Sequence, residues 1–479
     1  MITIVGGGLA GSEAAWQAAA SGVPVTLHEM RPVRPTAVHK TDRLAELVCS
    51  NSFRGDKLDN AVGLLKEEMR RLGSLVMRVA EACRVPAGAA LAVDRERFAA
   101  AITDALAEHP LITVVRDEVT TIPVSSEREP VIIATGPLTS EALSADLRQL
   151  VGQDALYFYD AISPIVLAES IDRDKVFRQS RWNRNTVTSQ ADQTTGPACG
   201  VDDGQGDYLN CPMTREEYER FYDAVIHAES ATVHDFDKER FFEGCLPIEV
   251  MAHRGTDTLR FGPMKPVGLV DPKSGRQPYA VVQLRQDTIA GDHYSLVGFQ
   301  TQLKWGEQER VLRMIPGLEH AEFVRFGMVH RNTYVNGPTV LADTWQVRAR
   351  PSLFLAGQMS GVEGYVESAA SGLLAGLNAA ALATGKPVAA APRTTAIGAL
   401  AYYVSHANPA HYEPSNITFG IMPALAADAL PPGRRRDKLA KKLAISERAL
   451  SDLQTWLNER PAQANDGRAT RRVSAVHPA

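Results

Sequence analysis

The chain has 479 residues, of which 44% are hydrophobic and 22% are charged, and its formal net charge is −5. This length predicts two or three domains of ordinary globular composition. The acidic balance excludes a globally basic nucleic-acid-binding protein, so any contact with nucleic acid requires a local basic patch.

The cysteines and the N-terminus narrow the class of protein further. The five cysteines are widely spaced and form no C-x-x-C pair, which argues against a disulfide framework, a zinc ribbon and a dithiol oxidoreductase. The first strand is expected at residue 2, which leaves no room for a signal or transit peptide. The sequence has no run of about 18 apolar residues, so it predicts no membrane span. We therefore expect a cytoplasmic protein without a membrane partner or a metal site.

The strongest motif lies in the first thirty residues. An apolar run at residues 2–5 precedes a glycine-rich turn, an expected helix at 9–21, and a second strand at 25–28 that ends at Glu29. This is the context of a dinucleotide-binding fingerprint. The glycines permit a tight turn and close approach of a pyrophosphate, the helix N-terminus faces the phosphates, and the acid can accept hydrogen bonds from a ribose. The predicted cofactor-binding residues are Gly6, Gly7, Gly8, Leu9, Ala10, Gly11 and Glu29.

A cysteine loop follows. Cys49 comes after a short apolar run and is followed by Ser50, Asn51 and, shortly after, Arg54. Hydrogen-bond donors and a cation near a thiol favour the thiolate, which is the nucleophilic form. A small buried cysteine would give the same pattern, and the residues alone leave the two interpretations equal.

Two further elements complete the N-terminal part. The apolar spacing from Leu58 to Leu72 predicts an amphipathic helix whose charged face, which includes Lys66, is expected in solvent. Later, a buried strand ends in Ala-Thr-Gly at Gly136. Such a strand passes close to the nucleotide in two-part flavoprotein domains, and glycine permits that approach. Together with the first motif, Gly136 favours FAD over NAD.

After about residue 160 the alternation of strands and helices stops. Prolines and aromatic residues mixed with short alternating segments predict an inserted α+β substrate domain, residues 161–325, built on an antiparallel sheet. Within it, Pro212 is expected to end a strand, and Thr214 can cap the helix that follows. We therefore expect Cys211 to be exposed at a strand-to-helix junction, where Asn210 and the helix N-terminus can stabilise a thiolate.

The far end of the insertion and the strand after it contain groups suited to a flat, glutamylated, anionic ligand. Aromatic rings can stack on such a ligand, and cations can pair with its carboxylates. Each of these residues taken singly is more often structural. The candidates are Lys265, Arg285, Trp305 and His330.

A second strand–glycine–helix unit then begins at residue 353. Its late position predicts a discontinuous Rossmann-like FAD-binding domain in an α/β fold, formed by residues 1–160 and 326–457. The N–H groups at the start of this helix would face the flavin or its phosphates, and Tyr365 can cover the isoalloxazine ring. The candidate cofactor-binding residues here are Gly357, Gln358 and Tyr365.

The last part is expected to be helical to about Leu457. It includes the strongest basic cluster of the chain, which is either a solvated helix end or a contact for an RNA backbone. The candidate RNA-binding residues are Arg434, Arg435, Arg436 and Lys438. The polar residues 458–479 are expected to form a disordered tail.

Four of these stretches together resemble one family. They are the glycine motif Gly6–Gly11, CSNSFRGDKLDN at residues 49–60, YLNCPM around Cys211, and GQMSGVEGYVESAA at residues 357–370. They resemble the folate- and FAD-dependent tRNA uracil-5-methyltransferases, which are related to the larger GidA-type tRNA-modifying flavoproteins. The resemblance covers about residues 1–455.

The resemblance implies C5 methylation of a tRNA T-loop uridine, which gives ribothymidine. It implies methylenetetrahydrofolate as carbon source, reduced FAD as methylene carrier and reductant, and NADH or NADPH as co-substrate. Uracil C5 becomes nucleophilic once a thiolate adds to C6, and the base must flip out of the T-loop. By resemblance, Cys211 is expected to attack C6, and Cys49 to act as the C5 base or to protect the methylene carrier. The sequence leaves this assignment open, together with the choice between monomer and homodimer.

Three other activities also remain open. The same chemistry on ribosomal RNA fits every motif equally well. A GidA-like wobble-uridine modifier is disfavoured by the short length and the missing C-terminal helical extension. A flavin-stabilised RNA-binding protein without catalysis predicts that both cysteines can be replaced without effect.

Overall fold

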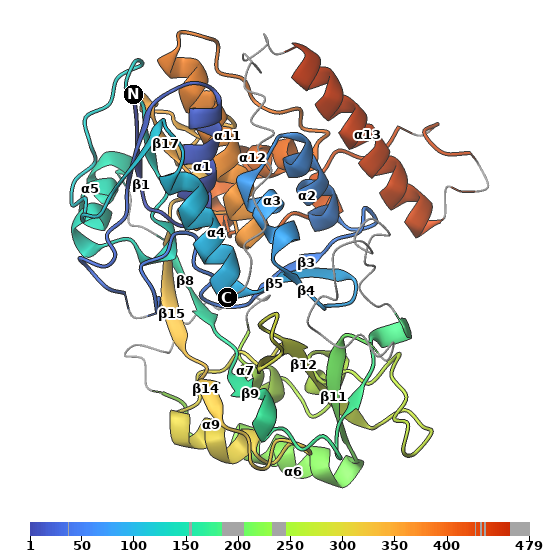
Figure 1. Cartoon of the computed structure of the whole chain (residues 1–479). Coiled ribbons are helices and arrows are strands. Elements are labelled where there is room, and N and C mark those ends of the chain that lie inside the picture. Colours follow the sequence, from blue (N-terminus) through green and yellow to red (C-terminus); the bar gives the residue numbers. More distant parts are fainter. Residues whose placement is uncertain are drawn as a thin grey trace.

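The computed structural model describes residues 1–459 except 37, 153–155, 184–205, 232–245, 427, 432–433 and 435–436, and for residues 156–161, 183 and 329–333 it describes the backbone alone. Of the tail expected at 458–479, residues 460–479 lie outside the described residues, whereas 458 and 459 belong to the last helix. Figure 1 shows an upper part, built from the two ends of the chain, above a lower part built from its middle.

A six-stranded sheet lies in the upper part, in the order β16-β17-β7-β1-β2-β6. All neighbours are parallel except β16, which pairs antiparallel with β17 at one edge. The strands are β1 (Ile2–Val5), β2 (Val25–His28), β6 (Ile112–Val115), β7 (Val131–Ile133), β16 (Gln346–Val347) and β17 (Arg350–Leu355). Because β17 pairs with β7, the last third of the chain completes a sheet that the first third begins.

Two helices hold these distant stretches together. Helix α1 (Leu9–Ala20) packs along α11 (Tyr365–Ala383), as Figure 1 shows. A Cβ atom on Gly372 would lie 2.1 Å from the carbonyl oxygen of Ala10, so this close contact requires glycine. By length and composition α11 is apolar enough to cross a membrane, but 83% of that stretch is buried inside the protein. It is therefore a core helix that brings the two predicted nucleotide-facing turns side by side.

The other helices of the upper part surround this pair. They are α2 (Ala61–Arg71), α3 (Leu75–Ala82), α4 (Arg95–Ala107), α5 (Glu141–Val151), α10 (Gly337–Val340), α12 (Ala396–His406) and α13 (Lys438–Glu459). A small sheet follows the cysteine loop, with β3 (Ser52–Gly55), β5 (Ala90–Val93) and β4 (Arg84–Val85) in that order. Helix α13 projects from this part at the right of Figure 1.

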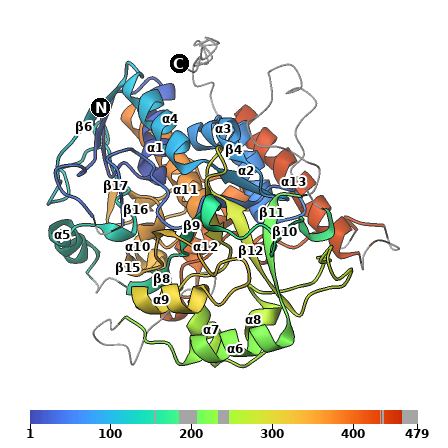
Figure 2. The same ribbon diagram turned by 60° about the horizontal axis from the view of Figure 1, so that its bottom comes forward.

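The lower part contains an antiparallel sheet in the order β10-β11-β12-β13-β9-β14. Its strands are β9 (Ile165–Leu167), β10 (Phe177–Arg178), β11 (Tyr208–Met213), β12 (Ala280–Gln286), β13 (His293–Leu296) and β14 (Phe323–Arg325). Its helices are α6 (Arg215–Ile226), α7 (Ile248–His253), α8 (Thr258–Phe261) and α9 (Trp305–Leu312). Figure 2 brings α6 to α9 forward at this end of the molecule.

Each part has its own hydrophobic core. The upper core takes residues from both ends of the chain, whereas every buried residue of the lower core lies between Val166 and Ala321. An antiparallel pair of strands, β8 (Leu156–Ala161) and β15 (Val329–Tyr334), runs between the two parts in Figure 1. We retain residues 161–325 as a proposed substrate domain.

Candidate functional site

A partly open cavity lies at the carboxyl ends of β1, β2 and β7. Ten of the predicted cofactor-binding residues line it: Gly6, Gly7, Gly8, Leu9, Ala10, Glu29, Gly136, Gly357, Gln358 and Tyr365. Gly11 has a different place, because a Cβ atom there would lie 1.8 Å from the carbonyl oxygen of Gly6. Gly11 therefore allows α1 to pack against the turn.

The glycine turn fits a bound dinucleotide. Gly6 has a φ of +104°, and a Cβ atom on it would lie 2.5 Å from the carbonyl oxygen of Ala134, so the fold itself requires glycine there. Gly8 differs, because a Cβ atom would meet no protein atom within 4 Å. Gly8 lines the cavity at the N-terminus of α1, where the N–H groups can receive a phosphate.

The carboxylate of Glu29 is held in place beside the glycine turn. Its carboxylate accepts hydrogen bonds from the backbone N–H of Gly7 at 2.9 Å, and from the backbone N–H and the Nε of Arg31 at 3.0 and 2.8 Å. Burial opposes ionisation, but these hydrogen bonds and the charge of Arg31 together lower the pKa of Glu29. An ionised carboxylate has about four acceptor positions, so one position remains for a ribose hydroxyl.

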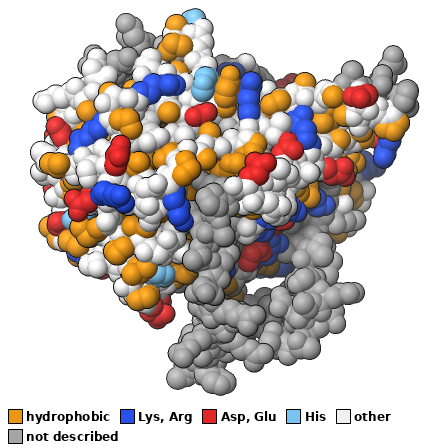
Figure 3. All heavy atoms as spheres, turned by 90° about the horizontal axis from the view of Figure 1, so that it is seen from above, with side chains coloured by type: hydrophobic (Ala, Val, Ile, Leu, Met, Phe, Trp, Pro, Cys, Tyr) orange, Lys and Arg blue, Asp and Glu red, His pale blue; other side chains and the backbone are white. Residues whose placement is uncertain are grey.

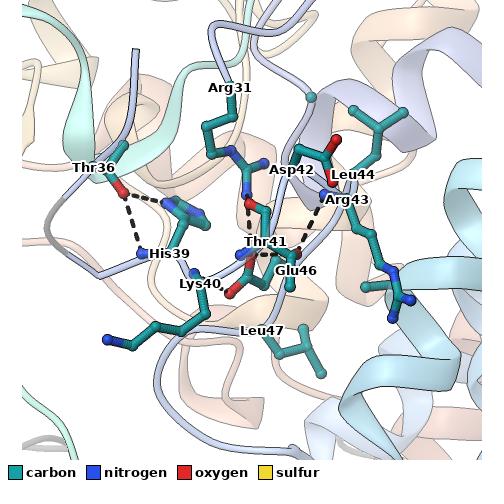
Figure 4. Close-up of polar contacts among 12 residues, drawn as sticks. Arg31, Thr36, His39, Lys40, Thr41, Asp42, Arg43, Leu44, Glu46 and Leu47 are labelled. Carbon is teal, nitrogen blue, oxygen red and sulfur yellow. Dashed lines mark hydrogen bonds and ion pairs between the residues drawn. The ribbon is translucent and has the colours of Figure 1, made fainter. Parts of the chain in front are cut away.

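The loop after β2 fixes Arg31 in turn. Figure 4 shows Arg31 pointing toward Thr41 and Glu46. Its Nη1 donates to the carbonyl oxygen of Thr41 and to the Glu46 carboxylate, both at 3.2 Å. Glu46 also accepts hydrogen bonds from the backbone N–H groups of Lys40 and Thr41. The loop therefore forms a connected wall beside Glu29.

Tyr365 connects the cavity to the cysteine loop. It begins α11, lines the cavity, and accepts hydrogen bonds at its hydroxyl oxygen from the backbone N–H of Cys49 at 2.8 Å and of Ser50 at 3.1 Å. Burial, and then the nearby Cys49, raise the pKa of Tyr365 far above its usual value. The phenol therefore stays neutral and ties the backbone of Cys49, which follows the cavity-lining Val48, to the cavity wall.

Two arginines hold the same loop from the other side. Arg285, at the end of β12, donates to the side-chain oxygens of Asn51 and Ser50, both at 2.8 Å. Arg95 donates to the carbonyl oxygen of Cys49 at 3.4 Å and pairs with Asp287 at 2.9 Å. Guanidinium groups around a thiol favour its thiolate form, so the loop provides a suitable environment for a reactive Cys49.

The segment that follows the loop is held by Lys66, for which the expected solvent exposure is wrong. Its side chain is fully buried, and its Nζ donates to the carbonyl oxygens of Phe53, Arg54 and Gly55 at 3.0, 3.1 and 2.7 Å. Burial lowers the pKa of Lys66 to about 8. Carbonyl oxygens provide the partners that a buried ammonium requires, and β3 supplies three of them.

The expected exposure of Cys211 is also wrong. Cys211 lies within β11, is 0% exposed, and pairs with Val282 of β12. The strand continues through Pro212 because β10 pairs only with Leu209 and Asn210, which leaves β11 as an edge strand beyond them. Edge strands tolerate proline. Burial raises the pKa of the Cys211 thiol far above its usual value, so the thiol is protonated in the core of the lower part.

The other predicted ligand residues lie on different elements from Arg285. Lys265 follows Met264, whose carbonyl oxygen accepts from the N–H of Val281, so Lys265 lies near the opposite end of β12, about 14 Å along the strand. Trp305 is exposed at the start of α9 and does not line the cavity. His330 lies on β15 opposite Asp160, and its side chain is outside the described residues.

The predicted basic cluster is described only in part. Arg434 and Lys438 are exposed, while Arg435 and Arg436 lie outside the described residues. On the face shown in Figure 3, Lys and Arg side chains are interspersed with acidic ones. Within the described part of the chain, no group of three or more His, Cys, Asp or Glu residues could hold a metal ion.

Comparison with known proteins identifies the family. The family model described as glucose inhibited division protein A matches residues 1–387. The methylenetetrahydrofolate–tRNA-(uracil-5-)-methyltransferase TrmFO of Desulforudis audaxviator is 58% identical over 460 residues, which is 96% of this chain and 98% of the relative. The protein of the same name from Symbiobacterium thermophilum is 57% identical over 95% of this chain and 96% of its own length. The chain belongs to the TrmFO family.

The fold of this TrmFO-family chain also matches a solved structure. Aquifex aeolicus GidA, in its form II crystal, has a TM-score of 0.65 and 16% identity over 96% of this chain and 73% of the GidA chain. At this identity the similarity shows the fold alone, an α/β fold of the GidA type. Together with the cavity, it supports the predicted Rossmann-like FAD-binding fold.

Proposed function

We propose that the protein transfers a one-carbon unit from methylenetetrahydrofolate to C5 of a T-loop uridine in tRNA, with FAD in the cavity and NADH or NADPH as the source of electrons. The activity named for relatives that are 55–58% identical over almost the whole chain supports this proposal. The observation that supports it best is the pair of hydrogen bonds from the backbone N–H groups of Cys49 and Ser50 to Tyr365, which connects the cysteine loop to a residue that lines the cavity.

The residues of the cavity take defined roles in this proposal. The turn Gly6–Gly8 and the N-terminus of α1 hold the pyrophosphate, Glu29 holds a ribose, and Gly136, Gly357 and Gln358 border the rest of the nucleotide. Bound FAD would carry the one-carbon unit and the electrons for the reaction. Cys49 either takes the proton from C5 or protects the carrier, because its loop lies next to the cavity.

Cys211 as the nucleophile at C6 remains a separate proposal. Its motif supports the role, but the thiol is buried in the core of the lower part, so the residues packed over it must move when RNA binds. RNA that contains 5-fluorouridine at the target position tests this, since fluorine at C5 cannot leave as a proton and the thiol adduct persists. A trapped peptide that contains Cys211 supports the proposal, and a trapped peptide that contains Cys49 reverses the two roles.

The RNA contact is proposed for the exposed start of α13. Arg434 and Lys438 are exposed there, and the net charge of −5 makes a local patch necessary. Each phosphate contact changes the slope of log affinity against log salt concentration by about one. Replacing Lys438 by Gln should therefore weaken tRNA binding and reduce the salt slope.

A cytoplasmic location fits a tRNA substrate.

The experiment that tests the proposed function is a single reaction. Purified FAD-loaded protein, NADPH, methylenetetrahydrofolate and an unmodified tRNA transcript are mixed, and the digested RNA is analysed for 5-methyluridine by mass spectrometry. We expect 5-methyluridine from the transcript and none from a transcript with the T-loop uridine replaced. If the protein oxidises NADPH but methylates only ribosomal RNA, the substrate part of the proposal is wrong.

A further inference from the structure

Three aromatic rings form a stack on the lower part of the molecule. Phe323 lies on β14, Phe326 follows that strand, and Trp305 begins α9. The ring centroids of Phe323 and Phe326 are 5.1 Å apart with planes at 19°, and those of Phe326 and Trp305 are 5.7 Å apart with planes at 15°. The three planes are nearly parallel, as they are in stacked nucleobases.

The outer end of this stack is open to solvent. Trp305 is 61% exposed, and Val324, between the two phenylalanines in sequence, is 50% exposed. A single exposed apolar residue needs no explanation, but apolar groups gathered on a surface mark contact sites. Because most of the Trp305 side chain is in solvent, the indole is accessible to a flat group.

Arg325 connects the stack with the cysteine loop. It lies on β14 next to Phe326, and its Nη2 atom is buried without a hydrogen-bond partner among the described residues. Burial, and then the charge of Arg95, lower the pKa of Arg325, and Tyr365 and Cys49 are among the other groups whose charges act on it. One short segment therefore carries two of the three stacked rings and a cation that interacts electrostatically with Cys49.

An RNA base fits this surface better than a folate. Trp305 does not line the cavity that would hold the flavin, on which a folate must react. The target uridine must leave its loop to reach the cavity, and the unpaired bases of RNA loops stack on aromatic side chains. Such stacking tolerates any base, because every base has a flat π face.

We propose that Trp305 is the outer ring of a platform on which an unpaired base of the substrate RNA stacks while the neighbouring uridine reaches the cavity. This inference rests on the proposed function, because it takes RNA as the substrate. It adds a recognition surface in the inserted part to the basic contact proposed on α13, and it assigns the stack to RNA instead of folate.

The test compares FAD-loaded wild-type protein with Trp305→Ala and Trp305→Phe. The probe is a fluorescein-labelled T-arm hairpin, whose Kd is measured by fluorescence anisotropy. We expect Trp305→Ala to raise the Kd about 5- to 150-fold, and Trp305→Phe to retain most of the affinity because it keeps a ring. Phe261→Ala is the matched control, since Phe261 is an aromatic residue on α8 that is 79% exposed and outside the stack. The control should bind like the wild type.

Other results would overturn the platform in distinguishable ways. An unchanged Kd in Trp305→Ala, while the wild type methylates tRNA, rejects the platform and leaves the proposed function standing. An unchanged Kd with a raised KM for methylenetetrahydrofolate assigns Trp305 to the folate instead. An unchanged Kd with altered sedimentation assigns it to contact between protein chains. If the wild type neither binds nor methylates any RNA, the proposed function fails, and the platform fails with it.

Discussion

Replacing Tyr365 by Phe removes one oxygen atom and keeps the ring that lines the cavity. That oxygen accepts from the N–H groups of Cys49 and Ser50 at 2.8 and 3.1 Å. A buried donor left without a partner costs about 1–3 kcal/mol, so the loop would lose about 2–6 kcal/mol if it stayed in place. We expect the loop to shift instead, and a shift of about 1 Å in a reacting group lowers the rate about 100-fold.

The assay is single-turnover methylation of saturating tRNA, combined with flavin absorbance and the rate at which iodoacetamide alkylates Cys49. We expect turnover about 100-fold below wild type, a changed alkylation rate, and normal FAD content, because the glycine turn is untouched. Tyr222→Phe is the control, since the Tyr222 hydroxyl donates at 3.1 Å to the carbonyl oxygen of Ala252, a residue of the lower core. Wild-type turnover and alkylation in Tyr365→Phe would refute the positioning role.

Four further variants test other parts of the account. Cys49→Ala should abolish methylation and keep FAD, as measured by 5-methyluridine and flavin absorbance; retained turnover would contradict the role of Cys49. Gly8→Val should fold but lose FAD, because the new side chain fills open space in the cavity. Gly372→Val should lower the Tm, because a Cβ atom there would lie 2.1 Å from the backbone of α1. A lower Tm in Gly8→Val and lost FAD in Gly372→Val would refute the roles given to the two glycines. Burial raises the pKa of Glu68 from 4.5 to about 8. The carboxyl group of Glu68 therefore binds its proton more tightly in the folded state than in the unfolded state. The stability that this difference contributes is fully present below pH 4.5 and is lost as pH rises toward 8. Glu68→Gln should reduce the fall in Tm between pH 4.5 and pH 8, measured by thermal unfolding. A Tm that depends on pH as in the wild type would contradict this role of Glu68.

Short-range patterns predicted the local fold around the glycine turn well. Strand β1, the glycine turn, α1, β2 and Glu29 follow one another within thirty residues, and their spacing alone determines that they meet. The sequence also predicted the second strand–glycine–helix unit, which is β17 and α11. A buried strand that ends in glycine before a helix of small residues is a signal within one short stretch. The glycines of α11 then explain why the two halves pack closely.

Tertiary contacts account for what the sequence did not show. Lys66 occupies the polar face of its helix, but β3 packs on that face and supplies carbonyl partners. Pro212 suggested a strand end, and only the pairing of β10 shows why β11 continues past it. Tyr365 is 316 residues from Cys49, and Arg95 is 46 residues from it. No local pattern indicates that these residues meet.

The most direct test of the central claim is the origin of the transferred carbon. The FAD-loaded protein is given NADPH, methylenetetrahydrofolate labelled with ¹³C at the methylene carbon, unlabelled S-adenosylmethionine and a tRNA transcript, and the T-loop fragment is analysed by mass spectrometry. The account predicts a labelled methyl group on the T-loop uridine. An unlabelled methyl group, or a methyl group at another nucleotide, would contradict it.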